Sequence, residues 1–208
     1  MTEEKHHRHT LPTNRLEALS DGIFAFAMTL LVFELQFPDT AILSKVPLSA
    51  LLWGQADRFF NYFLSFILLA LFWMVHHRTF HHIQRLNAPL LWMNILLLSF
   101  IVLIPFSTSL VGDFDKHSLA DAVFAGNIFI IGMFNLLIWF YATRERRFTS
   151  PELEEVAVRQ GLAKGLVVPL VSMLVIAASF IIPGNSSLLF LLIPLLQNDR
   201  MLKLIGVN

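Results

Sequence analysis

Residues 15–37, RLEALSDGIFAFAMTLLVFELQF, are the stretch that decides the fold. Twelve uncharged residues separate Asp21 from Glu34. In a helix they rise about 20 Å, which is less than the hydrocarbon thickness of a bilayer. A helix that crosses a membrane here must therefore hold at least one of the two carboxylates near the membrane boundary. An ionisable group at that depth is a candidate functional group.

The whole chain has the composition of an integral membrane protein. Of its 208 residues, 56% are apolar and only 14% are charged, which is an unusual balance for a soluble domain. The formal net charge is zero, so the sequence gives no electrostatic basis for a nucleic-acid partner. Cysteine is absent, which excludes disulfides and thiolate metal sites. The polar start shows no cleavable signal, so we expect the first apolar segment to be retained.

Uncharged runs of membrane-spanning length predict an all-α, polytopic membrane protein with six transmembrane helices, in one domain over residues 1–208. Pro105 is expected to kink the third helix. The turn signal at Pro183-Gly184-Asn185 divides the last long uncharged run into a fifth helix and a short sixth one. The predicted helices cover residues 15–37, 57–77, 89–111, 119–143, 165–182 and 187–198.

The distribution of lysine and arginine predicts that both termini are cytoplasmic, in the cell membrane of a prokaryote. With six helices, twelve basic residues fall on one side and three on the other. The larger group comprises Lys5, Arg8, Arg15, Arg78, Arg85, Arg144, Arg146, Arg147, Arg159, Lys164, Arg200 and Lys203, and the smaller group comprises Lys45, Arg58 and Lys116.

The first helix has an apolar face that carries a single hydroxyl. At 100° per residue, one stripe contains Gly22, Phe26, Thr29, Leu30 and Phe33. Ser20 and Asp21 point away from this stripe. Because a charge in a membrane helix needs protein partners, we expect Asp21 to turn toward its own subunit and bond to neighbouring helices. The stripe is then free to face lipid, packed protein or an aqueous path.

The spacing of these polar residues resembles a known first-helix signature. The pattern Arg15-x-x-x-Leu19-Ser20-Asp21, followed after seven residues by Thr29, is similar to that of the transmembrane protein 175 family. This family comprises the endosomal and lysosomal potassium channels and their single-repeat prokaryotic relatives. Leu19 stands where the family has Phe. Further parts that look like the family are the second-helix ending Trp73-x-x-His76-His77-Arg78-x-Phe80 and the third-helix Asn94.

The resemblance implies a homotetrameric, potassium-selective channel whose first helices line a central pore without a re-entrant filter loop. Consistent with this, the sequence contains no segment like TVGYG. The family's constriction lies three residues before the signature threonine. The implied pore residues are Phe26, Thr29, Leu30 and Phe33, and the implied structural polar network comprises Arg15, Ser20, Asp21, His77 and Asn94.

Apolar rings of this kind can gate a pore without a charged plug. A narrow apolar constriction excludes water, and a small change of helix tilt restores conduction. Potassium is favoured over sodium if the constriction forces partial dehydration, since the larger ion loses water at lower cost. Glu34 is expected to be a solvated interfacial residue, with a cation-concentrating ring as the alternative. The sequence leaves open whether Ile23 shares the constriction.

Two other functions remain as alternatives. A proton-coupled secondary transporter would use Asp21 and the histidine cluster as relay groups, although the first five segments lack the broken helices and inverted repeats of such carriers. A histidine-metal membrane enzyme would use the same cluster, but known sites of that type need several histidine boxes. We therefore expect no metal, no cofactor and no enzymatic activity. The cluster comprises His76, His77, His81 and His82.

Overall fold

The computed structural model describes residues 13–35, 46–114, 116–144, 148–150 and 152–198. Over these ranges the protein is helical and has no β-strand, as the all-α prediction requires. Five of the helical segments are long and apolar enough to cross a membrane. In chain order the elements are α1 (Thr13–Leu30), η1 (Leu31–Glu34), α3 (Leu48–Trp53), α4 (Ala56–His82), α5 (Ala88–Val102), α6 (Ile104–Asp113), α7 (Ser118–Thr143), α8 (Glu155–Ser179), η3 (Ser186–Leu191) and α9 (Leu192–Leu196).

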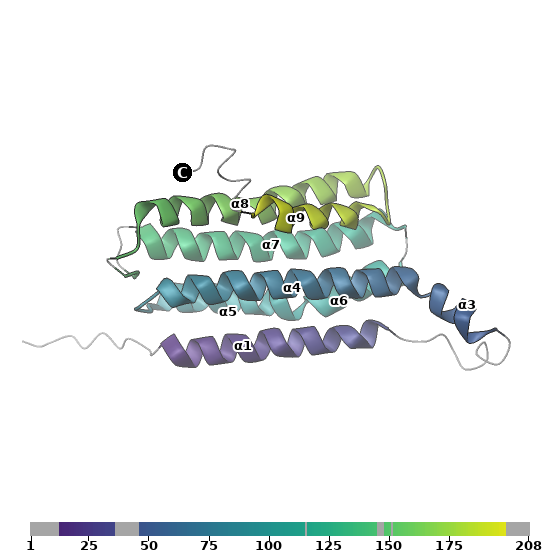
Figure 1. The fold of residues 1–208 in the computed structure, drawn as a ribbon, viewed down its shortest axis with the longest axis horizontal. Coiled ribbons are helices and arrows are strands. Elements are labelled where there is room, and N and C mark those ends of the chain that lie inside the picture. Colours follow the sequence, from purple (N-terminus) through teal and green to yellow (C-terminus); the bar gives the residue numbers. More distant parts are fainter. Residues whose placement is uncertain (1–12, 36–45, 115, 145–147, 151, 199–208) are drawn as a thin grey trace, which may run out of the picture.

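The helices lie side by side in three groups (Figure 1). Helix α1 runs along one edge and packs against α4 and α5. Helices α4, α5 and α6 form the middle of the subunit, and α7, α8 and α9 form the opposite side. Helix α1 is therefore covered on one side only.

The predicted kink at Pro105 is confirmed as a break between two helices. Helix α5 ends at Val102, and α6 begins at Ile104 with Pro105 in its first turn. Proline has no backbone N–H, and its ring clashes with the carbonyl four residues earlier, so the helical hydrogen bonding is interrupted before this position. The third membrane segment therefore consists of two consecutive helices, α5 and α6.

Several predicted boundaries are wrong because a charged or polar residue marks the membrane boundary and not the helix end. Helix α4 continues past His77 to His82, and α8 begins at Glu155 and not at residue 165. The first helix turns into a 3-10 helix, which covers Leu31–Glu34; its predicted end at residue 37 lies outside the described part of the chain. The short helix α3 is not predicted at all.

The sixth predicted helix is present as two short consecutive elements, η3 with six residues and α9 with five, which turn back along α8 (Figure 1). Together they form an apolar segment, Ser186–Leu196, that is shorter than the other five membrane segments. This segment is tied to the start of α7 by the buried carboxylate of Asp121. The backbone N–H of Gly184 and the hydroxyl of Ser186 both donate to Asp121 Oδ2 at 2.8 Å. Gly184 has φ 82°, a conformation that favours glycine.

Helices α7 and α8 pack closely because glycine residues let their backbones approach. A Cβ atom on Gly132 would lie 2.7 Å from a methyl group of Val168, and one on Gly161 would collide with the indole of Trp139. Trp139 in turn donates its Nε1–H to the carbonyl of Val158 at 3.1 Å. Small residues at membrane helix contacts have this effect generally. The α7–α8 hairpin is thus a tightly packed unit.

Candidate pore-lining site

The outer face of α1 is uncovered in the subunit and is apolar. The residues of its inner face, which are buried, are Leu16, Ser20, Phe24, Ala27 and Leu31. On the outer face, a stripe of exposed residues follows the helical spacing of three and four; it comprises Leu19, Gly22, Phe26, Thr29 and Phe33. The large side chains on this stripe are strongly exposed, with Phe26 at 58% and Phe33 at 64%. A face of this kind on a membrane helix needs lipid, protein or a pore against it.

Thr29 supplies the only polar side chain of this exposed stripe. Its hydroxyl donates to the carbonyl of Phe26 at 2.8 Å. Because this bond takes up the hydroxyl hydrogen, the oxygen atom keeps only its lone pairs, which can contact a cation or accept a hydrogen bond from water. Leu30 and Ile23, by contrast, are half-buried, and Ile23 packs against the subunit core.

A chain of buried hydrogen bonds fixes the rotation of α1. The His76 Nε2 atom lies 2.7 Å from Asn94 Oδ1, and Asn94 Nδ2 donates to Ser20 Oγ at 3.3 Å. Ser20 Oγ in turn donates to the Leu16 carbonyl at 2.9 Å. Because the amide oxygen can only accept, the histidine proton sits on Nε2 in this arrangement. The chain joins α4, α5 and α1 and holds Ser20 inward, so that the stripe faces outward.

The histidine of this chain is His76, and the predicted His77 takes no part in it. His76 is 2% exposed and lies between Phe24 and Phe80, with ring centroids 5.6 and 4.3 Å away. His77 is exposed and stacks on Trp73 at 5.7 Å. Adjacent residues differ by 100° around a helix, so only one of the two can reach Asn94. A sequence signal for this choice exists, because His76 continues the helical spacing of the apolar residues Leu69, Phe72 and Phe80, which are buried on α4.

Asp21 and Arg15 take no part in the buried chain. Asp21 is exposed on the flank of α1 and accepts a hydrogen bond from the indole Nε1–H of Trp73 at 2.9 Å. The expected partner on a neighbouring helix is thus present, although the carboxylate is not buried within the subunit. Arg15 is exposed at the start of the helix and makes none of these bonds.

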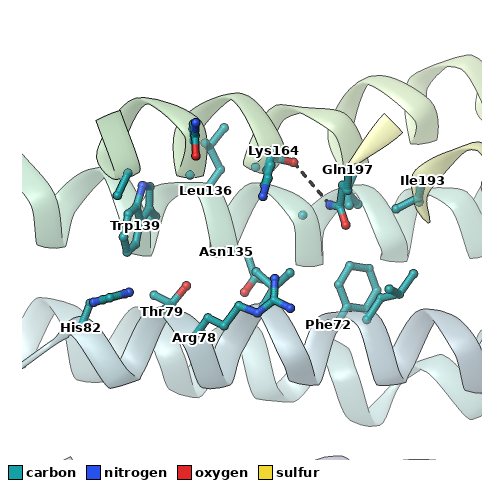
Figure 2. A pocket seen from close by; sticks show the side chains of 18 of the residues that line it. Phe72, Arg78, Thr79, His82, Asn135, Leu136, Trp139, Lys164, Ile193 and Gln197 are labelled. Atoms are coloured by element: carbon teal, nitrogen blue, oxygen red, sulfur yellow. Dashed lines mark hydrogen bonds between the residues drawn. The ribbon is translucent and has the colours of Figure 1, made fainter. Parts of the chain in front are cut away.

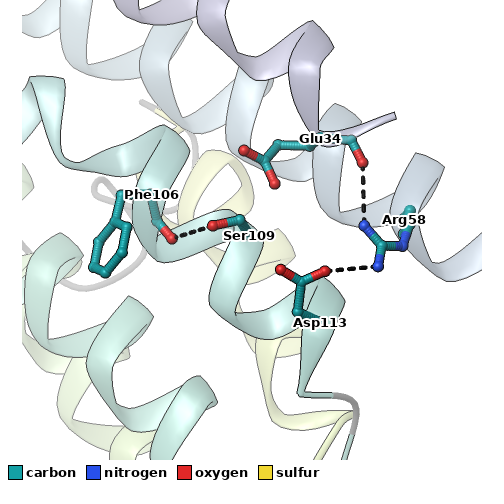
Figure 3. Close-up of polar contacts among 5 residues, drawn as sticks. All are labelled: Glu34, Arg58, Phe106, Ser109 and Asp113. Carbon is teal, nitrogen blue, oxygen red and sulfur yellow. Dashed lines mark hydrogen bonds and ion pairs between the residues drawn. The ribbon is translucent and has the colours of Figure 1, made fainter. Parts of the chain in front are cut away.

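At its other end, the first segment is anchored by Arg58 of α4. One guanidinium nitrogen of Arg58 lies 3.4 Å from the Glu34 carbonyl, and the other donates to Asp113 Oδ1 at 2.7 Å. Figure 3 shows that the Glu34 carboxylate points away from Arg58. Arg58 therefore ties the end of η1 to the end of α6, and the Glu34 side chain is not its partner. No sequence pattern pairs Arg58 with these groups, because they lie 24 and 55 residues away in the chain.

The histidine cluster does not form a metal site in the described part of the chain. His76 points inward, His77 lies on Trp73, and the rings of His81 and His82 meet edge to face at 5.6 Å. No three histidine, aspartate or glutamate side chains come together as metal ligands among the described residues. The four histidines are spread over different faces of α4.

Comparison with known proteins relates the chain to a family of ion channels. Residues 15–105 match the family model described as endosomal/lysosomal potassium channel TMEM175. The chain is 31% identical over 145 residues to a potassium channel of Chamaesiphon minutus, an alignment that covers 68% of this chain and 71% of that protein. It is 28% identical over 193 residues to the endosomal/lysosomal proton channel TMEM175 of Bos taurus, covering 86% of this chain but only 40% of the bovine protein.

A solved structure has the same fold. The crystal structure of a lysosomal potassium-selective channel TMEM175 homolog from Chamaesiphon minutus superimposes with a TM-score of 0.78 at 28% sequence identity. The match covers 90% of this chain and 98% of that one. The arrangement of helices around α1 is therefore shared with that protein.

Proposed function

Because this chain belongs to the TMEM175 family, we propose that it is a potassium-selective cation channel. Its pore would be formed by the α1 helices of a homotetramer, since one subunit offers a single lining helix and cannot enclose a path alone. The observation that carries this proposal is the uncovered apolar stripe of α1 with one hydroxyl at Thr29. Four copies of that stripe around an axis would form stacked rings of apolar side chains and one ring of hydroxyl oxygens.

Phe26 is the proposed constriction. It is the most exposed large apolar side chain of α1, and it lies one turn before Thr29. A ring of four phenyl groups excludes water when narrow and conducts after a small rotation or tilt of the helices. Phe33 and the half-buried Leu30 would extend the apolar path. Selectivity would come from partial dehydration, which potassium tolerates better than sodium.

The buried chain through Asn94 would have a positioning role in this channel. It fixes the rotation of α1 from within the subunit, so that the stripe presents Phe26 and Thr29 to the axis. Asp21 would add support on the flank through its bond to Trp73. We assign Ser20, Asp21, His76 and Asn94 to this support, and we place Arg15 at the membrane boundary before it.

The proposed orientation has both termini in the cytoplasm of a prokaryotic cell. The twelve-to-three distribution of basic residues supports it. Several of these residues, among them Lys5, Arg8, Lys45, Arg200 and Lys203, lie outside the described part of the chain. Those within it include Arg78, Arg85 and Arg159 on the proposed inner side and Arg58 on the outer side.

The relatives differ in the ion that their names give. The bovine protein is named a proton channel, and the Chamaesiphon protein is named a potassium channel. None of the stripe residues Leu19, Gly22, Phe26, Thr29 and Phe33 has a titratable side chain, and the exposed carboxylate of Asp21 beside them is bonded to Trp73. A carrier with Asp21 and the histidines as relay groups is less well supported, because Asp21 bonds an indole and His76 bonds an amide.

The test is a bilayer recording of the purified protein under gradients of potassium, sodium and protons, one at a time. The proposal expects a reversal potential that follows the potassium gradient and shifts little with sodium or pH. A reversal potential that follows the proton gradient, or a saturating flux tied to protons at fixed stoichiometry, would contradict it.

A further inference from the structure

An arginine of α4 holds the end of the first membrane segment. Element η1 packs against both α4 and α6, and Figure 3 shows Arg58 between the Glu34 carbonyl and the Asp113 carboxylate. One guanidinium nitrogen donates to the carbonyl at 3.4 Å, and the other donates to Asp113 Oδ1 at 2.7 Å. A Cβ atom on Gly112 would lie 3.7 Å from Arg58 Cγ, so the carbon chain of the arginine runs over this glycine. Arg58 therefore joins α4, η1 and α6.

The Glu34 carbonyl gains a donor from outside its own helix. The last carbonyl groups of a helix have no partner within it. In a continuing α-helix the donor would be the residue four positions later, which is Pro38, and proline has no N–H. The hydrogen bond at the end of η1 runs from the Leu35 N–H to the Val32 carbonyl and leaves the Glu34 carbonyl unused. The guanidinium of Arg58 thus takes the place of the N–H that proline lacks.

The 3-10 geometry of η1 brings that carbonyl to the level of Arg58. A 3-10 helix rises about 2.0 Å per residue, whereas an α-helix rises about 1.5 Å. Over the length of η1, Leu31–Glu34, the difference amounts to about 2 Å. An α-helical segment would withdraw the Glu34 carbonyl by this distance and break a contact that is already 3.4 Å long. The bond from Arg58 therefore favours the 3-10 form over the α form.

The same geometry decides where Phe33 points. Side chains three residues apart eclipse in a 3-10 helix. Phe33 therefore lies over Leu30, about 40° around the helix from Phe26. Glu34 lies over Leu31, and the burial agrees, since Leu31 is buried, Glu34 is half-buried and Phe33 is 64% exposed. In an α-helix Phe33 would turn by about 60° and come within about 20° of Phe26.

We propose that Arg58 is a positioning residue of the channel, which keeps the Phe33 ring away from the ion path by holding η1 in its 3-10 form. The inference rests on the proposed function, because it concerns the width of a pore that the α1 helices line. Without the arginine, η1 would relax toward an α-helix and Phe33 would turn to nearly the same side as Phe26. The outer part of the pore would then narrow. Arg58 is not on the stripe and acts through η1.

The first test compares single-channel conductance of Arg58→Met and wild-type channels in about 1 M potassium chloride, where charges are screened beyond about 3 Å. Methionine keeps an unbranched apolar chain over Gly112 but donates no hydrogen bond. Loss of one hydrogen bond shifts the balance between two helical forms about five-fold, so the conductance should fall by up to that factor. The direct effect of the lost positive charge has the opposite sign, because a less positive mouth attracts more cations.

Two controls separate positioning from general damage. In a Phe33→Ala background, Arg58→Met should leave the conductance of Phe33→Ala unchanged, because no phenyl ring remains to move. Arg78→Met removes an arginine from the other end of α4, where its side chain lines a cavity to which α1 contributes none of the described residues (Figure 2); it should conduct like the wild type. The proposal is overturned if Arg58→Met conducts like the wild type, or if its defect persists in the Phe33→Ala background.

Thiol labelling tests the same rotation without any current. Glu34→Cys keeps the backbone carbonyl that Arg58 contacts and places one thiol in a cysteine-free chain. This position lies over the buried Leu31 in the 3-10 form and turns about 60° toward the exposed stripe in the α form. In detergent, added Arg58→Met should raise the rate of maleimide labelling about five-fold, while the rate at Thr29→Cys stays the same. Equal rates at Glu34→Cys with and without Arg58→Met overturn the proposal, whether or not the protein conducts potassium.

A matched pair at Asp113 gives a second set of variants, which decides the question if Arg58→Met does not fold. Asp113→Asn keeps an oxygen that accepts from Arg58, whereas Asp113→Ala frees that end of the guanidinium. The labelling rate at Glu34→Cys should rise with Asp113→Ala and stay unchanged with Asp113→Asn. Equal rates in the two variants would overturn the proposal. A wild type without potassium current would contradict the proposed function, and these labelling rates would still report on the role of Arg58.

Discussion

Replacement of Asn94 by leucine should destabilise the subunit, because it breaks the hydrogen-bond chain that orients α1. The 2.7 Å contact with His76 and the 3.3 Å bond to Ser20 are both lost. A hydrogen bond between membrane helices is worth about 0.6 kcal/mol on average, and a buried donor left without a partner costs about 1–3 kcal/mol. Ser20 keeps its bond to the Leu16 carbonyl. The expected cost is therefore about 2–3 kcal/mol, which is set mainly by His76.

The double variant Asn94→Leu/His76→Phe tests this reasoning. Phenylalanine has no donor to leave unsatisfied, and its ring can occupy the space between Phe24 and Phe80. Removal of both partners is often nearly neutral, so the double variant should recover most of the lost stability. Thermal unfolding in detergent measures both, and the single variant should melt about 4–12 °C lower than the wild type.

Asn127→Leu is the matched control. Asn127 is also buried, but its Oδ1 has no partner among the described residues and its Nδ2 makes only a 3.3 Å bond to Ser107. Its replacement should change stability by less than about 1 kcal/mol. The reasoning is refuted if Asn94→Leu melts like the wild type, or if the double variant is as unstable as the single one.

Three further predictions concern other parts of the subunit. Phe26→Ala should raise single-channel conductance or weaken selectivity for potassium over sodium, since it widens the proposed constriction; unchanged currents in bilayers would count against Phe26. Asp21→Ala should lower expression and assembly, measured by size-exclusion chromatography, through loss of the bond to Trp73; a well-assembled oligomer with altered ion preference would contradict this. Asp121→Ala should cost about 2–4 kcal/mol of thermal stability, because Gly184 and Ser186 lose their acceptor, while single-channel conductance stays unchanged; a normal melting temperature would refute that role.

The sequence predicted the α-helical membrane fold and the outward stripe of α1 because both depend on periodicity. A span is visible as a long uncharged run, and an exposed face is visible as a spacing of three and four residues. Pro105 predicted a kink in the third membrane segment, where α5 and α6 meet, for an equally local reason. The family resemblance added the roles of Phe26 and Thr29, which no periodicity assigns.

Other features depend on contacts that a one-dimensional pattern does not contain. The choice between His76 and His77 rests on which side of α4 meets Asn94, and the two differ by one residue in the sequence. The end of α4 at His82 and the start of α8 at Glu155 differ from the predicted ones because hydropathy reports membrane depth, whereas a helix can continue beyond the apolar region. The partners of Arg58 lie 24 and 55 residues away along the chain, and those of Asp121 lie 63 and 65 residues away.

The central claim is that the α1 stripes of several copies surround the ion path, and the absence of cysteine from the chain makes a direct test possible. Thr29→Cys introduces one thiol on the stripe, and Met28→Cys introduces one at the adjacent position, which packs against the core. A charged, water-soluble thiol reagent should block potassium current through Thr29→Cys channels and leave Met28→Cys channels unaffected. A Thr29→Cys channel that conducts potassium and is indifferent to the reagent would contradict the account.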